Sequence, residues 1–175
     1  MQITNIFVAA LAAGSATAAS VSSRAARRSA PASCQRFGAN EALFSASVSG
    51  DYDQTQSLSF NVGPTSAGPC SLIGQFNQGF PIRVKNPEHS RLDVRNADGA
   101  LIGSFPPLKL ETTDGVLYTV AETTVVTINS FACQPTFDFE FSLANDAGID
   151  DYAFVFFERN TEGGFFIQAG DQCNQ

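Results

Sequence analysis

Apolar and polar residues alternate along positions 136–143, and this period of two restricts the fold of the chain more than any other feature. The apolar positions of the segment are Phe137, Phe139, Phe141 and Leu143. Successive side chains of an extended strand point to opposite faces, so these four fall on one side and the polar residues fall on the other. The pattern is typical of a β-strand with one buried and one solvated face.

Similar strand signals recur along the chain and are separated by turn residues. The segments that we expect to form strands are 43–48, 57–62, 70–76, 91–95, 101–105, 116–119, 123–128, 136–143, 152–158 and 164–167. Asn96–Gly99 and Asp114-Gly115 each stand between two such segments and predict hairpins, because glycine readily adopts the positive φ of tight turns. About eight to ten short strands with no long amphipathic helix predict an all-β, antiparallel two-sheet β-sandwich, with a β-barrel as the alternative.

Sixteen phenylalanines stand out in a chain that has no tryptophan. We interpret most of them as the filling of the space between the sheets, where large side chains are needed. Phe157 and Phe166 each follow another phenylalanine and interrupt the alternation. The sequence therefore predicts that one of these two is the exposed exception.

The N-terminal region predicts export. Residues 6–13 are a short apolar run followed by small residues, so 1–19 is interpreted as a signal peptide. Either Ala16 and Ala18 or Thr17 and Ala19 could fill the two small-residue positions of the cleavage site, which places the cut after Ala18 or Ala19. The run is too short to span a bilayer, which needs about 20 residues. Residues 20–33 have the composition of a pro-segment or flexible arm, and Arg27-Arg28 resembles a dibasic processing site. The remainder, 34–175, is predicted to be a single domain.

Charge excludes two classes of partner. The whole chain has a formal net charge of −7, and cleavage after Arg28 would remove three arginines and no acid, which leaves seven basic against seventeen acidic residues and a net charge of −10. Such a surface repels phosphate groups. We therefore expect neither nucleic acid nor an anionic membrane as a partner.

Four cysteines in an exported domain predict two disulfides. They are Cys34, Cys70, Cys133 and Cys173, and three pairings are possible. The nested pairing, Cys34–Cys173 with Cys70–Cys133, would tie both ends of the domain and clamp its middle. A zinc site is disfavoured, because the chain has no Cys-x-x-Cys pair and only one histidine, His89.

No residue set stands out as an active site. His89 lies in a polar loop beside Pro87 with no nucleophile motif nearby, so a hydrolytic triad is not expected. Asp138 and Glu140 share one strand face, and either could act with Glu158 as a carboxylate pair in glycoside hydrolysis. Such pairs are common on any solvated sheet face, and no cofactor is predicted.

The segment 145–151 concentrates oxygen donors around a glycine. Its acids, Asp146, Asp150 and Asp151, are a weak candidate for calcium binding. The segment does not match the twelve-residue EF-hand loop, and an Asx-rich turn between two strands accounts for the same residues.

Two motifs resemble a known family. Residues 58–76 contain a Phe-bearing strand, a short Ala-Gly loop and then Cys70-Ser-Leu, and later the chain has Ser130-Phe-Ala-Cys133 and a Phe-rich end with Gly164-Phe-Phe-Ile167. Together they resemble a fungal domain family named after the C-terminal part of But-two, a ubiquitin-like-activator-binding protein. The resemblance implies a β-sandwich in a fungal protein, many members being secreted, with no established catalytic residues. It also favours a Cys70–Cys133 bridge.

Export, disulfides and the lack of an active-site pattern lead to one functional prediction and two alternatives. We predict a secreted, non-enzymatic β-sandwich that binds a surface, either cell-wall polysaccharide or a host or cell-surface protein. The first alternative is a secreted effector that recognises a host protein. The second is a carboxylate-dependent polysaccharide hydrolase that uses Asp138, Glu140 or Glu158.

Overall fold

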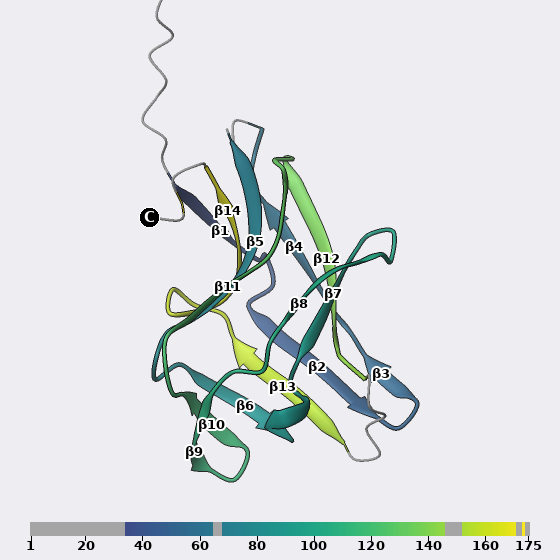
Figure 1. Ribbon diagram of the computed structural model, residues 1–175, viewed down its shortest axis with the longest axis vertical. Coiled ribbons are helices and arrows are strands. Elements are labelled where there is room, and N and C mark those ends of the chain that lie inside the picture. The colour runs from purple at the N-terminus through teal and green to yellow at the C-terminus, as the bar shows by residue number, and fades with distance from the viewer. Residues whose placement is uncertain (1–33, 65–67, 146–151, 171–172, 174–175) are drawn as a thin grey trace, which may run out of the picture.

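Fourteen strands and one 3₁₀ turn, η1 (Pro87–His89), form the computed structural model, which describes residues 34–64, 68–145, 152–170 and 173 (Figure 1). The strands are β1 (Gln35–Gly38), β2 (Leu43–Ser49), β3 (Tyr52–Gln54), β4 (Gln56–Asn61), β5 (Pro69–Phe76), β6 (Pro81–Lys85), β7 (Leu92–Asn96), β8 (Leu101–Phe105), β9 (Leu110–Asp114), β10 (Leu117–Val120), β11 (Thr124–Ala132), β12 (Thr136–Leu143), β13 (Ala153–Glu158) and β14 (Gly163–Ala169). The predicted all-β class is confirmed, and each predicted strand segment is present. Four further strands, β1, β3, β6 and β9, take the number above the eight to ten expected.

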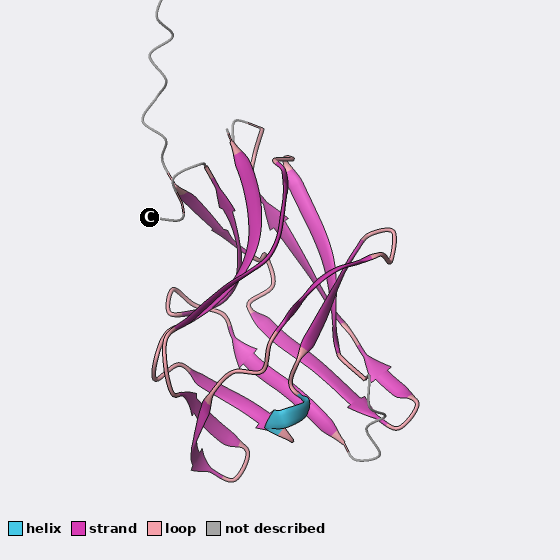
Figure 2. Cartoon of the chain, viewed as in Figure 1, coloured by secondary structure: helices cyan, strands magenta, loops and turns pink. Residues whose placement is uncertain are grey.

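Antiparallel pairing joins the strands into three sheets, and strands dominate the whole cartoon (Figure 2). Sheet A has the order β1-β14-β5-β11, sheet B the order β3-β2-β13-β6-β10-β9, and sheet C the order β4-β12-β7-β8. The strands β4, β5 and β6 follow one another in the sequence but belong to sheets C, A and B. The chain therefore crosses repeatedly between sheets, and pairing between distant segments holds the fold together.

Sheet C packs against both other sheets. The ring of Phe141 on β12 lies 5.7 Å from that of Phe44 on β2 and 4.5 Å from that of Phe165 on β14, measured between centroids. Both partners are almost completely buried. The predicted sandwich packing is thus present, with sheet C facing sheets A and B across a shared core.

Sheets A and C also approach each other along two edges. The Asn129 side chain on β11 donates a hydrogen bond from Nδ2 to the Ile102 carbonyl oxygen on β8, at 2.8 Å. At the other edge, the Asn40 amide just after β1 donates to the Ser59 carbonyl oxygen on β4, also at 2.8 Å. These contacts give the two sheets some of the closure of a barrel, the alternative that the sequence left open.

Phenylalanine fills the space where the sheets meet. The contacting rings belong to Phe44, Phe76, Phe80, Phe105, Phe141, Phe157 and Phe165. Each ring pair adds about 0.5–1.5 kcal/mol to the free energy of burial itself. The interpretation of the phenylalanines as core is confirmed for these seven residues.

The prediction that Phe157 or Phe166 is exposed is wrong for both residues. Phe157 is 3% exposed because it points inward with Val155 from β13, and Phe166 is 4% exposed. Phe166 lies on the outer face of sheet A, where the Arg36 guanidinium covers its ring at 4.7 Å from the centroid. The half-buried phenylalanines of β13 are instead Phe154 and Phe156.

The predicted disulfides are present in the nested pairing. Cys34 bonds to Cys173, and Cys70 bonds to Cys133. The second bridge joins Cys70, which is completely buried near the start of β5, to Cys133, which lies just after β11. The two bridges therefore fix the neighbouring ends of β1 and β14 and the paired strands β5 and β11. No helix in the described part of the chain is long and apolar enough to cross a membrane.

Candidate functional site

Three aromatic side chains follow one another on the outer face of sheet B. Strand β13 buries Ala153, Val155 and Phe157, so the alternate residues Phe154 and Phe156 point outward and remain partly exposed. Tyr152, which directly precedes the strand, is 50% exposed, and its ring centroid lies 5.5 Å from that of Phe154. The centre of the widest sheet therefore carries a short row of rings, which we call the aromatic row (Tyr152, Phe154 and Phe156).

Residues of different character flank the aromatic row on its two sides. On one side, Phe154 pairs with Ser47 and Phe156 with Ser45 of β2. On the other, the same phenylalanines pair with Lys85 and Arg83 of β6. Directly opposed residues of antiparallel strands share a face and hold their β-carbons about 4.5–5.5 Å apart. The row thus runs between small hydroxyl side chains and two cationic ones.

Exposed apolar side chains are concentrated on this face. The described large apolar residues that are most exposed are Leu43, Tyr52, Leu101, Val116, Leu117, Val125 and Tyr152. Strand register places Leu43, Tyr52 and Leu117 outward on sheet B, together with Tyr152. Four of these seven residues therefore lie on one face, which makes that face a candidate contact surface.

A polar depression of about 410 Å³ lies between β3 and sheet C. Glu140 and Arg95 line it together with Asp53, which comes from β3. The Arg95 guanidinium donates a hydrogen bond from Nη1 to the Ser142 hydroxyl at 3.0 Å. Loss of solvation raises the pKa of the Asp53 carboxyl; Arg95 lowers it and Glu140 raises it further. A carboxyl group with a raised pKa that shares a depression with another carboxylate is a candidate general acid.

The three carboxylates singled out in the sequence do not line one depression. Glu140 lines the polar depression, whereas Asp138 lines a neighbouring one of about 380 Å³ beside Phe131. Glu158 ends β13 in sheet B and lines neither of them. The carboxylates that share the depression with Glu140 are instead Asp53 and Asp93, neither of which was predicted from the sequence.

The other candidate sites predicted from the sequence have less structural support. Within the described residues, no group of three or more His, Cys, Asp or Glu side chains is arranged to hold a metal ion. His89 closes η1, where its backbone amide donates to the Asn86 carbonyl oxygen. The calcium candidates Asp146, Asp150 and Asp151 lie outside the described residues, as do the processing candidates Ala18, Ala19, Arg27 and Arg28.

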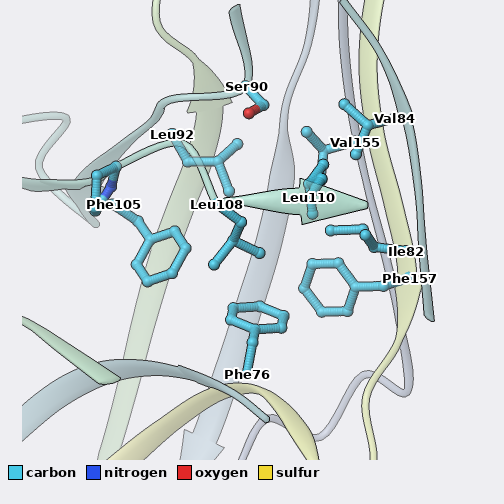
Figure 3. Close-up of a pocket in the computed structure, with 11 residues that line it drawn as sticks. Phe76, Ile82, Val84, Ser90, Leu92, Phe105, Leu108, Leu110, Val155 and Phe157 are labelled. Atoms are coloured by element: carbon cyan, nitrogen blue, oxygen red, sulfur yellow. The ribbon is translucent and has the colours of Figure 1, made fainter. Parts of the chain in front are cut away.

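An apolar cavity inside the core is too small to be a ligand site. Figure 3 shows Phe76, Leu108 and Phe157 pointing toward one another around it. Ser90 is the one polar residue in its lining, and that hydroxyl donates to the Pro87 carbonyl oxygen. The volume of about 10 Å³ leaves room for no more than about one water molecule. We interpret the cavity as an imperfection of packing between sheets B and C.

Comparison with known proteins does not identify the chain. No protein-family model matches the sequence, and no curated protein matches it. The resemblance to the But-two family therefore stays a prediction. The outer face of sheet B is the candidate site that rests on the largest number of independent structural features.

Proposed function

We propose that the protein is a secreted, non-catalytic polysaccharide-binding module, and that its ligand lies along the aromatic row of sheet B. The single observation that carries the proposal is the line of Tyr152, Phe154 and Phe156 on the outer face of β13. Two disulfides and the N-terminal signal pattern support export, since disulfides persist in oxidising compartments.

The geometry of the row suits a sugar chain. Residues two apart on a strand are about 6.6 Å apart, so the rings follow one another in a line. Aromatic side chains offer a rigid apolar face that is well suited to stacking, at little cost in conformational entropy. The CH groups on the face of a pyranose ring can stack on such a surface, while hydroxyls such as that of Ser45 lie beside it.

Retention on polysaccharides tests the proposal. Purified, disulfide-bonded protein from the full-length chain is mixed with insoluble cellulose, chitin or β-glucan, and the bound fraction is measured. Binding to soluble polygalacturonate or its methyl ester is measured by electrophoresis through gels that contain the polymer. We expect retention on at least one polymer. Tyr152→Ala should weaken it about tenfold, since loss of an aromatic contact worth about 1.4 kcal/mol is a tenfold change in affinity. Leu101→Ala is the matched control, since Leu101 is 57% exposed but lies in sheet C.

Two outcomes would contradict the proposal. Absence of retention on every polymer would exclude polysaccharide binding, and retention that Tyr152→Ala and Phe154→Ala both leave unchanged would exclude the aromatic row. Thermal unfolding of each variant separates loss of binding from loss of fold.

Hydrolysis by the polar depression is the second candidate, favoured by the raised pKa of Asp53 beside Glu140. Reducing sugars are measured in the supernatants of the same mixtures. Release that Glu140→Gln abolishes would favour this candidate over a purely binding module. The non-catalytic proposal expects no release above that of the variant.

A further inference from the structure

We infer that the polysaccharide is a polyuronide, a polymer whose sugar rings carry carboxylates; this inference rests on the proposed function. Its starting point is the position of Arg83 and Lys85. Both side chains are exposed on β6, directly opposite Phe156 and Phe154. They are two residues apart and therefore point to the same face, about 6.6 Å from each other along the strand.

Neither cation has a side-chain partner in the described part of the chain. Among the residues that the structure describes, the side chains of Arg83 and Lys85 take part in no ion pair, hydrogen bond or ring contact. Arg36, by contrast, lies over the Phe166 ring, and Lys109 pairs with Glu122 at 2.8 Å. Two charges beside the aromatic row are therefore available to a ligand.

Within the described residues, the other charged side chains that the sheet B strands carry on this face lie toward its margins. Glu158 follows Phe156 at the end of β13, and Glu111 and Asp114 are on the edge strand β9. Asp114 is in the same row as Arg83 but is separated from it by Leu117 of β10. The face thus has a cationic flank along the row, although the predicted mature chain has a net charge of −10. This local reversal of charge is complementary to an anionic ligand.

A uronate ring combines the two groups that this surface can bind. Its carboxylate lies at the edge of the ring, so both faces stay free to stack on Tyr152 or Phe154. Arginine binds a carboxylate through two parallel hydrogen bonds, and lysine binds it as a point charge. A polymer of such rings can present carboxylates to Arg83 and Lys85 while its faces follow the aromatic row.

Polygalacturonate and its methyl ester provide the test, because esterification removes the charge and keeps the sugar backbone. Affinity is measured by gel electrophoresis through each polymer, with a chelator present so that calcium cannot bridge an acidic protein to an acidic polymer. We expect the wild-type protein to bind the acid form more tightly than the ester and to lose this preference at high salt. Binding of a polyanion by so acidic a protein cannot arise from its net charge.

Two double variants with the same change in net charge locate the effect. Arg83→Gln/Lys85→Gln should weaken binding of the acid form about tenfold, since each exposed charge pair contributes up to about a fivefold change. Val125→Glu/Thr127→Glu lowers the charge by the same two units on exposed positions of β11, in sheet A, and should change it much less. Tyr152→Ala should weaken binding of both polymers.

The outcomes separate this inference from the proposed function. The polyuronide inference would be overturned if the protein bound the acid and the ester equally, or bound neutral polymers alone. If Tyr152 were still required for that binding, the polysaccharide proposal would stand. Preference for dextran sulfate over polygalacturonate would also overturn it. Lack of binding to any polysaccharide would overturn both.

Discussion

Gly103 on β8 lies against the carbonyl oxygen of Ile128 on β11, so closely that a β-carbon built on the glycine would be 2.5 Å from that oxygen. The close approach lets the edges of sheets A and C meet, and the Asn129–Ile102 hydrogen bond forms beside it. A glycine is needed here because of the neighbouring backbone, which cannot rotate away as a side chain would.

Gly103→Ala should therefore lower the free energy of unfolding by about 1–3 kcal/mol, the usual cost of overpacking a well-packed contact. Guanidinium unfolding measures this. Leu101→Ala in the same strand is the control, because Leu101 is 57% exposed and its change should stay within about 0.5 kcal/mol. Equal stability of Gly103→Ala and wild type would mean that the two edges do not meet closely in solution.

Neighbouring phenylalanines of β13 should respond very differently to truncation. Phe157 is 3% exposed and its ring stacks on that of Phe44 at 4.7 Å between centroids, so Phe157→Ala should cost about 3–5 kcal/mol. Phe156 is only half-buried, and Phe156→Ala should cost about 1 kcal/mol. Thermal unfolding compares the two, and a larger loss for Phe156→Ala would reverse the inward and outward assignment of the strand.

Local patterning in the sequence was sufficient for the fold class and for most strands. Each of the ten expected segments forms a strand because its apolar residues have a hydrophobic face to bury, as β12 does with Phe139 and Phe141. The hairpin glycines Gly99 and Gly115 have the positive φ expected of them, +78° and +54°. Strand β6 was not predicted because its alternation contains only two apolar residues, Ile82 and Val84, which is too short a pattern to indicate a strand by itself.

The candidate site depends on information that a local pattern does not contain. Outward placement of Phe154 follows from alternation once the phase is known, but the phase of a run such as Phe154–Phe157 is decided by which residues the core accepts. Pairing of Phe154 with Lys85 depends on the register of two strands far apart in the sequence. Glu140 likewise lines the same depression as Asp53 because β3 lies beside sheet C, an arrangement that no spacing in the sequence indicates.

Loss of the Cys70–Cys133 bridge should destabilise the protein strongly. The bridge closes a loop with a sequence separation of 63 residues, and the chain-entropy model gives roughly 4 kcal/mol for a loop of that length. We expect Cys70→Ala/Cys133→Ala to lower the guanidinium midpoint accordingly. Both cysteines are replaced together so that no unpaired thiol remains.

The double variant Cys34→Ala/Cys173→Ala serves as the comparison. Its bridge has a longer separation of 139 residues, for which the same model gives about 5 kcal/mol, but it lies at the ends of the described chain, with Cys34 exposed. Truncation there removes little packing, whereas Cys70 is completely buried. An unchanged midpoint in Cys70→Ala/Cys133→Ala would contradict the role of this bridge in holding β5 to β11.

Acid stability should depend on Glu41. Its carboxylate accepts hydrogen bonds from the Ser59 backbone amide at 2.9 Å and the Ser59 hydroxyl at 2.8 Å. Partial burial alone would raise the pKa of Glu41, but these hydrogen bonds and the charge of Arg159 outweigh it and lower the pKa below its usual value of 4.5. An acid whose pKa is lower in the folded state stabilises that state when ionised.

The stabilisation is therefore complete above pH 4.5 and is lost as the pH falls through the lower pKa of the folded state. Glu41→Gln should be less stable than wild type at neutral pH and should lose less stability between about pH 5 and pH 3. Urea unfolding across that range measures both. Glu111→Gln is the control, since Glu111 is exposed on β9, and it should follow the wild-type curve. If Glu41→Gln lost stability with falling pH as steeply as wild type, the hydrogen bonds from Ser59 would not stabilise the ionised Glu41 carboxylate of the protein in solution.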